Sequence, residues 1–159
     1  MEKFKTLVDK INVVLVKIVT VLFVLMSIAC FVQILFRYAL KLPLPWTEEL
    51  ARFLFVWVVF IGGAVDVKGK VHVGIDNFVE KLKLKPKRMV YTISYMLCIF
   101  MSAVISYYGF IVVQRMVGQA SPAMRISMSY VYLAIPLGFL VSALNFIYLG
   151  LDLYMQPSK

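Results

Sequence analysis

The sequence predicts an all-α integral membrane protein with four transmembrane helices. Two observations lead to this prediction. First, 62% of the 159 residues are hydrophobic, whereas a soluble domain has about 45–50% apolar residues. Second, these residues are concentrated in four blocks with few or no charges, each close to the ~20 residues that a helix needs to cross a bilayer. Helices are favoured over barrel strands, because an isolated apolar segment in lipid can pair its backbone groups internally only as a helix.

The four blocks define one membrane domain over residues 1–159. The spans are expected at residues 18–36, 50–67, 89–113 and 126–151. The first, third and fourth have no charged residue, and the second has one near each end, Arg52 and Asp66. The last two are long enough to tilt in the bilayer. We interpret the first as an uncleaved helix, because it exceeds the ~7–15 apolar residues of a signal peptide.

The distribution of Lys and Arg predicts which side of the membrane each connection occupies. Twelve of the 17 basic residues lie before the first span, between the second and third, or after the fourth. The positive-inside rule therefore places both termini and the middle loop in the cytoplasm. The net charge of +9 is explained by this sidedness. Membrane lipids are thus expected partners, and nucleic acid is not.

The middle loop is expected to contain an interfacial amphipathic helix at about residues 71–82. Val71, Ile75 and Phe78 begin an apolar stripe at helical spacing, while His72 and Asp76 fall on the opposite side. A segment of this kind lies in the plane of the lipid headgroups. His72 is the only histidine of the chain. A surface hydrogen bond is expected for it, and no metal site, because no second ligand stands near.

Charged and polar side chains gather at the end of the first helical hairpin. Glu48 and Glu49 are expected in the first turn of the second helix, with Arg52 four and three residues later on the same side. Gln33 and Arg37 share a face of the first helix, and the short connection brings Arg37 near both carboxylates. Ionisable groups at membrane depth are costly and tend to be paired. We therefore predict a partly desolvated cluster that fixes the hairpin or a partner helix, with solvated helix-end charges as the alternative.

The pattern over residues 33–76 resembles the small membrane subunit of TRAP transporters, the DctQ family. The resemblance covers the whole chain in length, number of spans and expected topology, but the third and fourth spans contribute no specific motif. The residues that carry it are Arg37, Tyr38, Pro45, Trp46, Thr47, Glu48, Glu49, Leu50, Ala51, Arg52, Trp57, Gly62, Gly63 and the run from Val71 to Asp76.

The resemblance implies a role in a tripartite secondary transporter. In this family a periplasmic substrate-binding protein captures an organic acid, such as a C4-dicarboxylate or sialic acid. A large membrane subunit then moves the acid with a cation gradient, usually of sodium. The small subunit packs beside the large TRAP membrane subunit, extends its fixed scaffold and adds docking surface for the binding protein. No catalytic activity and no cofactor are implied.

Candidate residues for partner contacts follow from the motif and from the few deep polar side chains. The motif candidates are Gln33, Arg37, Tyr38, Trp46, Glu48, Glu49, Arg52, Trp57, Gly62 and Gly63. His72 and Asp76 of the middle loop, and Asn145 inside the fourth span, are further candidates.

Three alternative functions compete with this interpretation. The membrane anchor of an oxidoreductase with a bis-histidine haem needs two histidines within its spans, and the chain has one in total. A self-sufficient exporter would rely on a carboxylate in the first span, yet no acid lies between Asp9 and Glu48. The residues alone do not exclude a third alternative, a structural four-helix scaffold of another membrane complex.

The two cysteines, Cys30 and Cys98, lie in separate apolar blocks and are expected to be plain packing residues.

Overall fold

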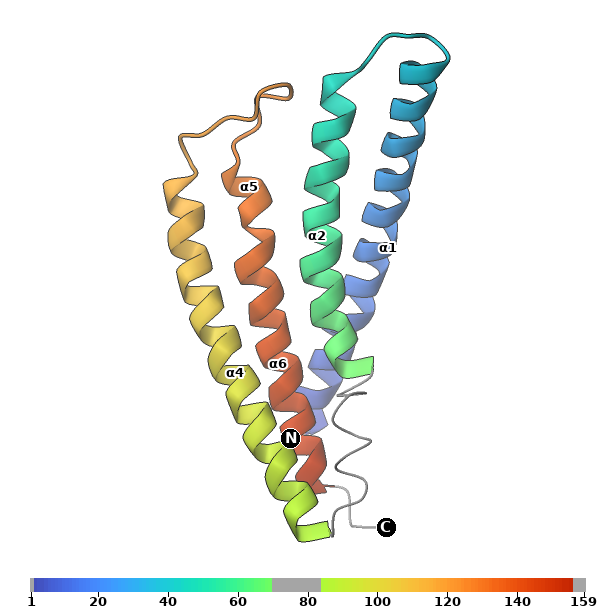
Figure 1. The fold of residues 1–159 in the computed structure, drawn as a ribbon. Coiled ribbons are helices and arrows are strands. Elements are labelled where there is room, and N and C mark those ends of the chain that lie inside the picture. Colours follow the sequence, from blue (N-terminus) through green and yellow to red (C-terminus); the bar gives the residue numbers. More distant parts are fainter. Residues whose placement is uncertain (1, 70–83, 156–159) are drawn as a thin grey trace.

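The computed structural model describes residues 2–69 and 84–155, and its main elements are long helices. Four helical segments are long and apolar enough to cross a membrane, which confirms the predicted fold class. They are α1 (Glu2–Tyr38), α2 (Pro45–Gly69), α4 (Leu84–Arg115) and the pair α5 (Ser129–Tyr132) and α6 (Ala134–Met155) (Figure 1). The predicted interfacial helix at 71–82, with His72 and Asp76, lies outside the described residues.

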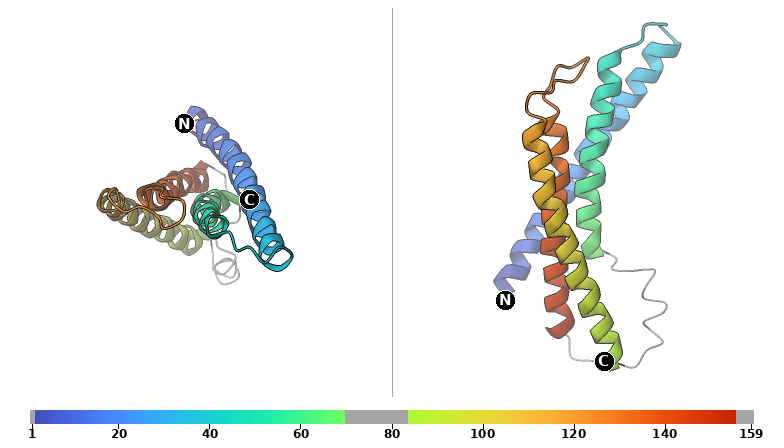
Figure 2. Two further views of the ribbon diagram at one scale, coloured as in Figure 1. Left: turned by 90° about the horizontal axis from the view of Figure 1, so that it is seen from above. Right: turned by 60° about the vertical axis from the view of Figure 1, so that its left-hand side comes forward.

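The helices stand in an open row, in the order α1, α2, α6, α4. In this row α1 packs along α2, α2 along α6, and α6 along α4. Seen from above in Figure 2, α2 lies between α1 and the pair formed by α6 and α4. Within the described helices, α4 has no extensive contact with α1 or α2. The bundle is therefore not closed, and apolar faces of α1 and α4 are left uncovered.

The row has two distinct ends. The connection between α1 and α2 and the connection between α4 and α5 lie together at one end, which we call the hairpin end (Figure 1). The N-terminus of α1 and the C-terminal turns of α6 lie toward the other, which we call the terminal end.

Helix α1 is much longer than the span predicted from it. Its 37 residues correspond to about 55 Å at 1.5 Å per residue, against ~30 Å for the hydrocarbon core. It begins 16 residues before the predicted span starts at Ile18. The added turns bury Val8 and Asn12, which shows that tertiary contacts stabilise a segment that hydropathy alone leaves out.

The break between α5 and α6 is explained by Pro136. Proline has no N–H, and its ring collides with the carbonyl group four residues earlier, here that of Tyr132, where α5 ends. Pro136 is fully buried, and its own carbonyl accepts a hydrogen bond from the Ser106 hydroxyl of α4 at 3.1 Å. The fourth helical segment begins at Ser129, three residues after the predicted start of the span, because Ser127 belongs to a β-bridge with Ala120.

Helices α2 and α6 approach each other closely at one glycine. A Cβ atom built on Gly138 would lie 2.7 Å from the carbonyl oxygen of Phe60. Only glycine fits at this distance, because the Phe60 carbonyl group belongs to the backbone and cannot move aside as a flexible side chain could. The Phe60 ring also packs on Phe139, with 6.1 Å between centroids, so the two central helices are in close contact here.

Candidate interaction surface

At the hairpin end, Glu49 ties α2 to the connection between α4 and α5. One carboxylate oxygen accepts a hydrogen bond from the backbone N–H of Ala123 at 3.0 Å, and the other accepts from Met124 at 2.8 Å. Because both oxygens are engaged, the side chain holds two successive peptide groups at once. The carboxylate also carries the charge that makes such bonds stronger than neutral ones.

The connection held by Glu49 has its own internal structure. Ser121 is 2% exposed; its N–H donates to the Ile126 carbonyl at 2.9 Å, and its hydroxyl accepts from the Ile126 N–H at 3.2 Å. Its carbonyl accepts from the N–H of Arg125, which has a φ of 54°. Left-handed backbone at a non-glycine residue is uncommon. The loop over residues 116–128 at the hairpin end therefore has a defined backbone conformation, held by its own hydrogen bonds.

The remaining charges of the predicted cluster form no ion pair with Glu49 in the described structure. Glu48 and Arg52 form an ion pair of 3.2 Å whose side chains are 58% and 67% exposed. Arg37 is exposed, and in the described structure it forms no ion pair with either glutamate. Spacing along the helix placed Glu48 beside Arg52 correctly. It could not show that Glu49, about 100° further round the helix, faces a loop more than 70 residues later.

Some motif residues nevertheless share one pocket. Gln33 and Arg37 of α1 meet Glu48 of α2 around a cavity of about 130 Å³ at the hairpin end. The connecting residues Pro43 to Pro45 complete its lining. The structure thus brings Arg37 and Glu48 to one opening without joining them.

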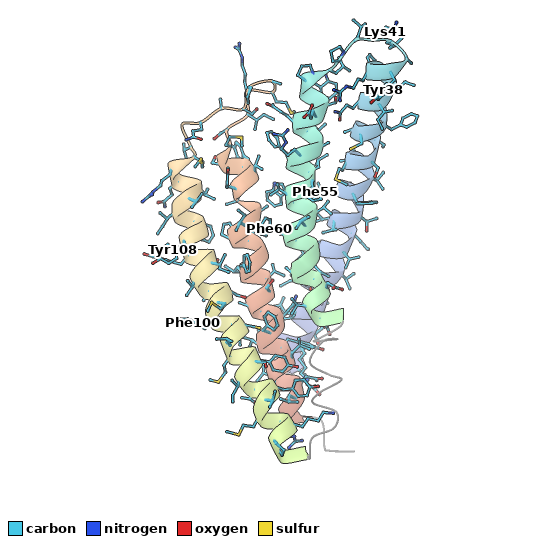
Figure 3. The ribbon with its side chains drawn as sticks, in the orientation of Figure 1. Tyr38, Lys41, Phe55, Phe60, Phe100 and Tyr108 are labelled. Carbon is cyan, nitrogen blue, oxygen red and sulfur yellow. The ribbon has the colours of Figure 1, made fainter. Side chains whose placement is uncertain are left out.

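The aromatic and glycine candidates take different positions. Tyr38 is 75% exposed, near Lys41 at the tip of the hairpin (Figure 3), and Trp46 is also exposed, whereas Trp57 is half-buried. Gly62 faces α1, since a Cβ built there would lie 3.5 Å from Val19. Gly63 has no atom within 4 Å of such a Cβ and faces open space.

At the terminal end, two buried amides join three helices. The side-chain nitrogen of Asn12 donates to the amide oxygen of Asn145 at 2.7 Å, and that of Asn145 donates back at 3.0 Å. The second N–H of each amide goes to a backbone carbonyl, that of Val8 for Asn12 and that of Ala64 for Asn145. All four N–H groups are satisfied, so α1, α2 and α6 share one closed network. Asn145, a candidate for a functional contact, therefore serves here as an internal tie.

A second set of contacts surrounds Tyr148 near these amides. Lys68 forms an ion pair with Asp9, and Lys5 forms one with Asp152. The two ammonium groups lie 4.7 Å and 5.5 Å from the centre of the Tyr148 ring, within cation–π range. Counting charges by side of the membrane missed these pairs, because their members are 59 and 147 residues apart in sequence.

The uncovered helix faces complete the candidate surface. Phe100 and Tyr108 point away from the row on the outer side of α4, and Phe55 projects from α2 (Figure 3); all three are more than half exposed. Among the described residues, no group of three His, Cys, Asp or Glu side chains could hold a metal ion. In this part of the chain, polar groups join helices and loops, and apolar faces are left for lipid or another protein.

These features define a multi-pass membrane protein built as an open row of helices. The family comparison agrees with this class: residues 26–153 match the family of tripartite ATP-independent periplasmic transporters, DctQ component. The chain belongs to this family.

Three relatives illustrate the similarity. The chain is 30% identical over 106 residues to the C4-dicarboxylate TRAP transporter small permease protein DctQ of Rhodobacter capsulatus, covering 65% of this chain and 47% of the relative. It is 42% identical over 55 residues to the sialic acid TRAP transporter small permease protein SiaQ of Vibrio cholerae, covering 35% and 32%. It is 26% identical over 96 residues to the isethionate TRAP transporter permease protein DctMQ of Oleidesulfovibrio alaskensis, covering 59% and 15%. The chain thus aligns with half or less of the length of each of these proteins.

Proposed function

We propose that this chain is the small membrane subunit of a TRAP-type secondary transporter. It packs beside the large membrane subunit and supports the uptake, driven by a cation gradient, of an organic acid delivered by a periplasmic binding protein. The observation that carries the proposal is the family match over residues 26–153. In this role the chain performs no catalytic step and needs no cofactor of its own.

The arrangement of polar groups supports an accessory role. A transporter that works alone usually places polar groups or broken helices at the bilayer midplane to bind substrate and ion. In the described helices, Asn12 and Asn145 are occupied with each other and with backbone carbonyls. Thr20 and Ser27 bond to carbonyls of their own helix. The open row, which leaves apolar helix surface uncovered, fits a subunit that completes its packing against a larger one.

Sidedness follows from the distribution of charge. We place the terminal end in the cytoplasm and the hairpin end in the periplasm of a bacterial or archaeal inner membrane, because twelve of the 17 basic residues belong to the terminal side. The loop over 116–128 then faces the periplasm, where the binding protein would approach. The contacts around Tyr148 then lie at the inner headgroups.

The substrate class comes from the relatives. Their names specify C4-dicarboxylate, sialic acid and isethionate, all of which are organic acids. We assign an organic acid to this system, of the C4-dicarboxylate or sialic acid class.

Reconstitution in liposomes tests the proposal. The chain alone, under an inward sodium gradient, should show no uptake of labelled succinate or sialic acid. The chain together with its cognate large subunit and binding protein should take up one of them. Uptake by the chain alone would contradict an accessory role. Failure of the tagged chain to co-purify with the large subunit would remove the proposed partner.

A further inference from the structure

The open row leaves a groove over α6, with walls formed by α2 and α4. The groove has a volume of about 330 Å³ and lies along the apolar part of the helices. Its floor includes Gly138 and Ser142 of α6, and its walls include Gly63 of α2 and Ser102 of α4. The groove exists because α2 and α4 both pack on α6 and not extensively on each other.

Ser102 is a buried polar group without a partner in the described structure. Its side chain lines the groove, and the residue is 4% exposed. Three other hydroxyls of the membrane helices are satisfied: Ser27 and Ser142 each donate to the carbonyl four residues earlier, and Ser106 donates to the Pro136 carbonyl. Ser102 lies near the middle of the predicted span 89–113, where no water compensates an unpaired hydroxyl. Its hydroxyl therefore calls for an acceptor brought from outside the described chain.

Gly63 provides the second, independent observation. Gly138, on the floor of the same groove, is explained by its close contact with Phe60. Gly63 has no such explanation, because a Cβ atom there would meet nothing within 4 Å. Glycine in the middle of a helix costs about 1 kcal/mol relative to alanine in an exposed position. In membranes, small residues of this kind let the backbone of a second helix approach closely.

We propose that this groove receives a transmembrane helix of the large subunit. The helix passes close to Gly63 and supplies an oxygen acceptor, from its backbone or a side chain, to the Ser102 hydroxyl. This inference rests on the proposed function, since it names where the large subunit packs. A lipid acyl chain would fill the apolar volume but has no acceptor for Ser102, so a protein helix is the better occupant.

Photocrosslinking tests the identity of the occupant. Val59, which also lines the groove and is 45% exposed, is replaced by p-benzoylphenylalanine in cells that produce the complete transporter, and the membranes are irradiated. The expected adduct joins this chain to the large subunit. The matched control carries the same residue at Ala103, which is exposed on α4 but is not part of the groove, and it should react with lipid.

Substitutions test the two features separately. Gly63→Leu should fit the isolated chain, because the space is open, but it should block the groove and reduce co-purification of the large subunit at least tenfold. Ala103→Leu adds the same kind of side chain outside the groove and should leave co-purification unchanged. Ser102→Ala should weaken the assembly about threefold, the usual worth of one hydrogen bond between membrane helices. Ser27→Ala, whose hydroxyl is bonded within its own helix, should have no effect.

The outcomes distinguish this inference from the function on which it rests. Suppose that the parent chain co-purifies with the large subunit, while Gly63→Leu does so equally well. The groove proposal is then overturned and the proposed function stands. An adduct from the probe at Val59 with lipid only, or with a second copy of this chain, overturns it in the same way. If the parent chain does not co-purify with the large subunit, both proposals fail.

Discussion

The two ends of the helix row are held together in different ways. At the terminal end, three helices share a closed network of buried amides, with two ion pairs around Tyr148 beside it. At the hairpin end, one half-buried carboxylate, Glu49, holds a loop by its backbone, while Glu48 and Arg52 face outward. The difference indicates that the terminal end fixes the internal arrangement of the helices. The hairpin end keeps charged groups available for contact with another protein.

The largest expected effect concerns the sides of the membrane on which the two ends lie. Single cysteines at Lys85 and at Gln119, in a chain lacking Cys30 and Cys98, should differ completely in reaction with an impermeant thiol reagent. In intact spheroplasts, the cysteine at 119 should be labelled and the cysteine at 85 should not, since the basic residues predict a cytoplasmic middle loop. Permeabilised membranes should label both. Labelling of position 85 in intact spheroplasts would contradict this orientation and place the terminal end in the periplasm.

The next effect concerns the buried amides of the terminal end. Asn145→Leu removes the partners of the Asn12 amide and of the Ala64 carbonyl in a site with no exposure. Leaving a buried polar group unsatisfied costs about 1–3 kcal/mol, so the thermal unfolding temperature in detergent should fall clearly. The double variant Asn12→Leu/Asn145→Leu should lose less than the sum of the single variants, because neither amide is then stranded.

A control separates the amide network from general helix packing. Ser142→Ala removes a hydroxyl from the same helix, but that hydroxyl bonds only to Gly138 of α6 itself. It should change the unfolding temperature little. If Ser142→Ala and Asn145→Leu behave alike, the amide network does not join the helices.

A smaller and local effect is expected for Glu49. Glu49→Ala removes both acceptors of the loop N–H groups, so the amides of Ala123 and Met124 should exchange with deuterium several-fold faster. The amides within α2 and α6 should be unchanged, because the carboxylate ties only the loop. Glu48→Ala serves as the control and should leave loop exchange as it is. Equal protection of the loop in both variants would show that Ser121 alone shapes it.

The smallest effect on the isolated chain is expected for the exposed pair. Glu48→Ala or Arg52→Ala should change the free energy of unfolding by only ~0–1 kcal/mol, as for other surface ion pairs. If the large subunit buries this pair on assembly, removing one partner should cost the complex ~3–5 kcal/mol. Comparing unfolding of the chain with its co-purification yield distinguishes the two cases. If both single variants fold and assemble like the parent, the Glu48–Arg52 pair stays exposed to solvent in the complex.

The candidate residues show what local sequence patterns could reveal. The spacing of Glu48 and Arg52 predicts their pairing, because four residues along a helix bring side chains to one face. The same reasoning grouped Glu49 with them, although its partners come from a loop that no local pattern connects to α2. Asn145 stands out in the sequence as a polar residue deep in the fourth span, whereas its partner Asn12 does not, because it precedes the first predicted span.

The sequence by itself determined the all-α class, the four apolar segments and the family. Each apolar segment enters a bilayer according to its own length and composition, so no knowledge of its neighbours is needed. Only the tertiary structure decided that the helices form an open row, that α1 extends to bury Asn12, and that Ser102 faces a groove without a partner. Those features depend on residues far apart in sequence coming to lie side by side, and the contacts among them are set by packing between helices.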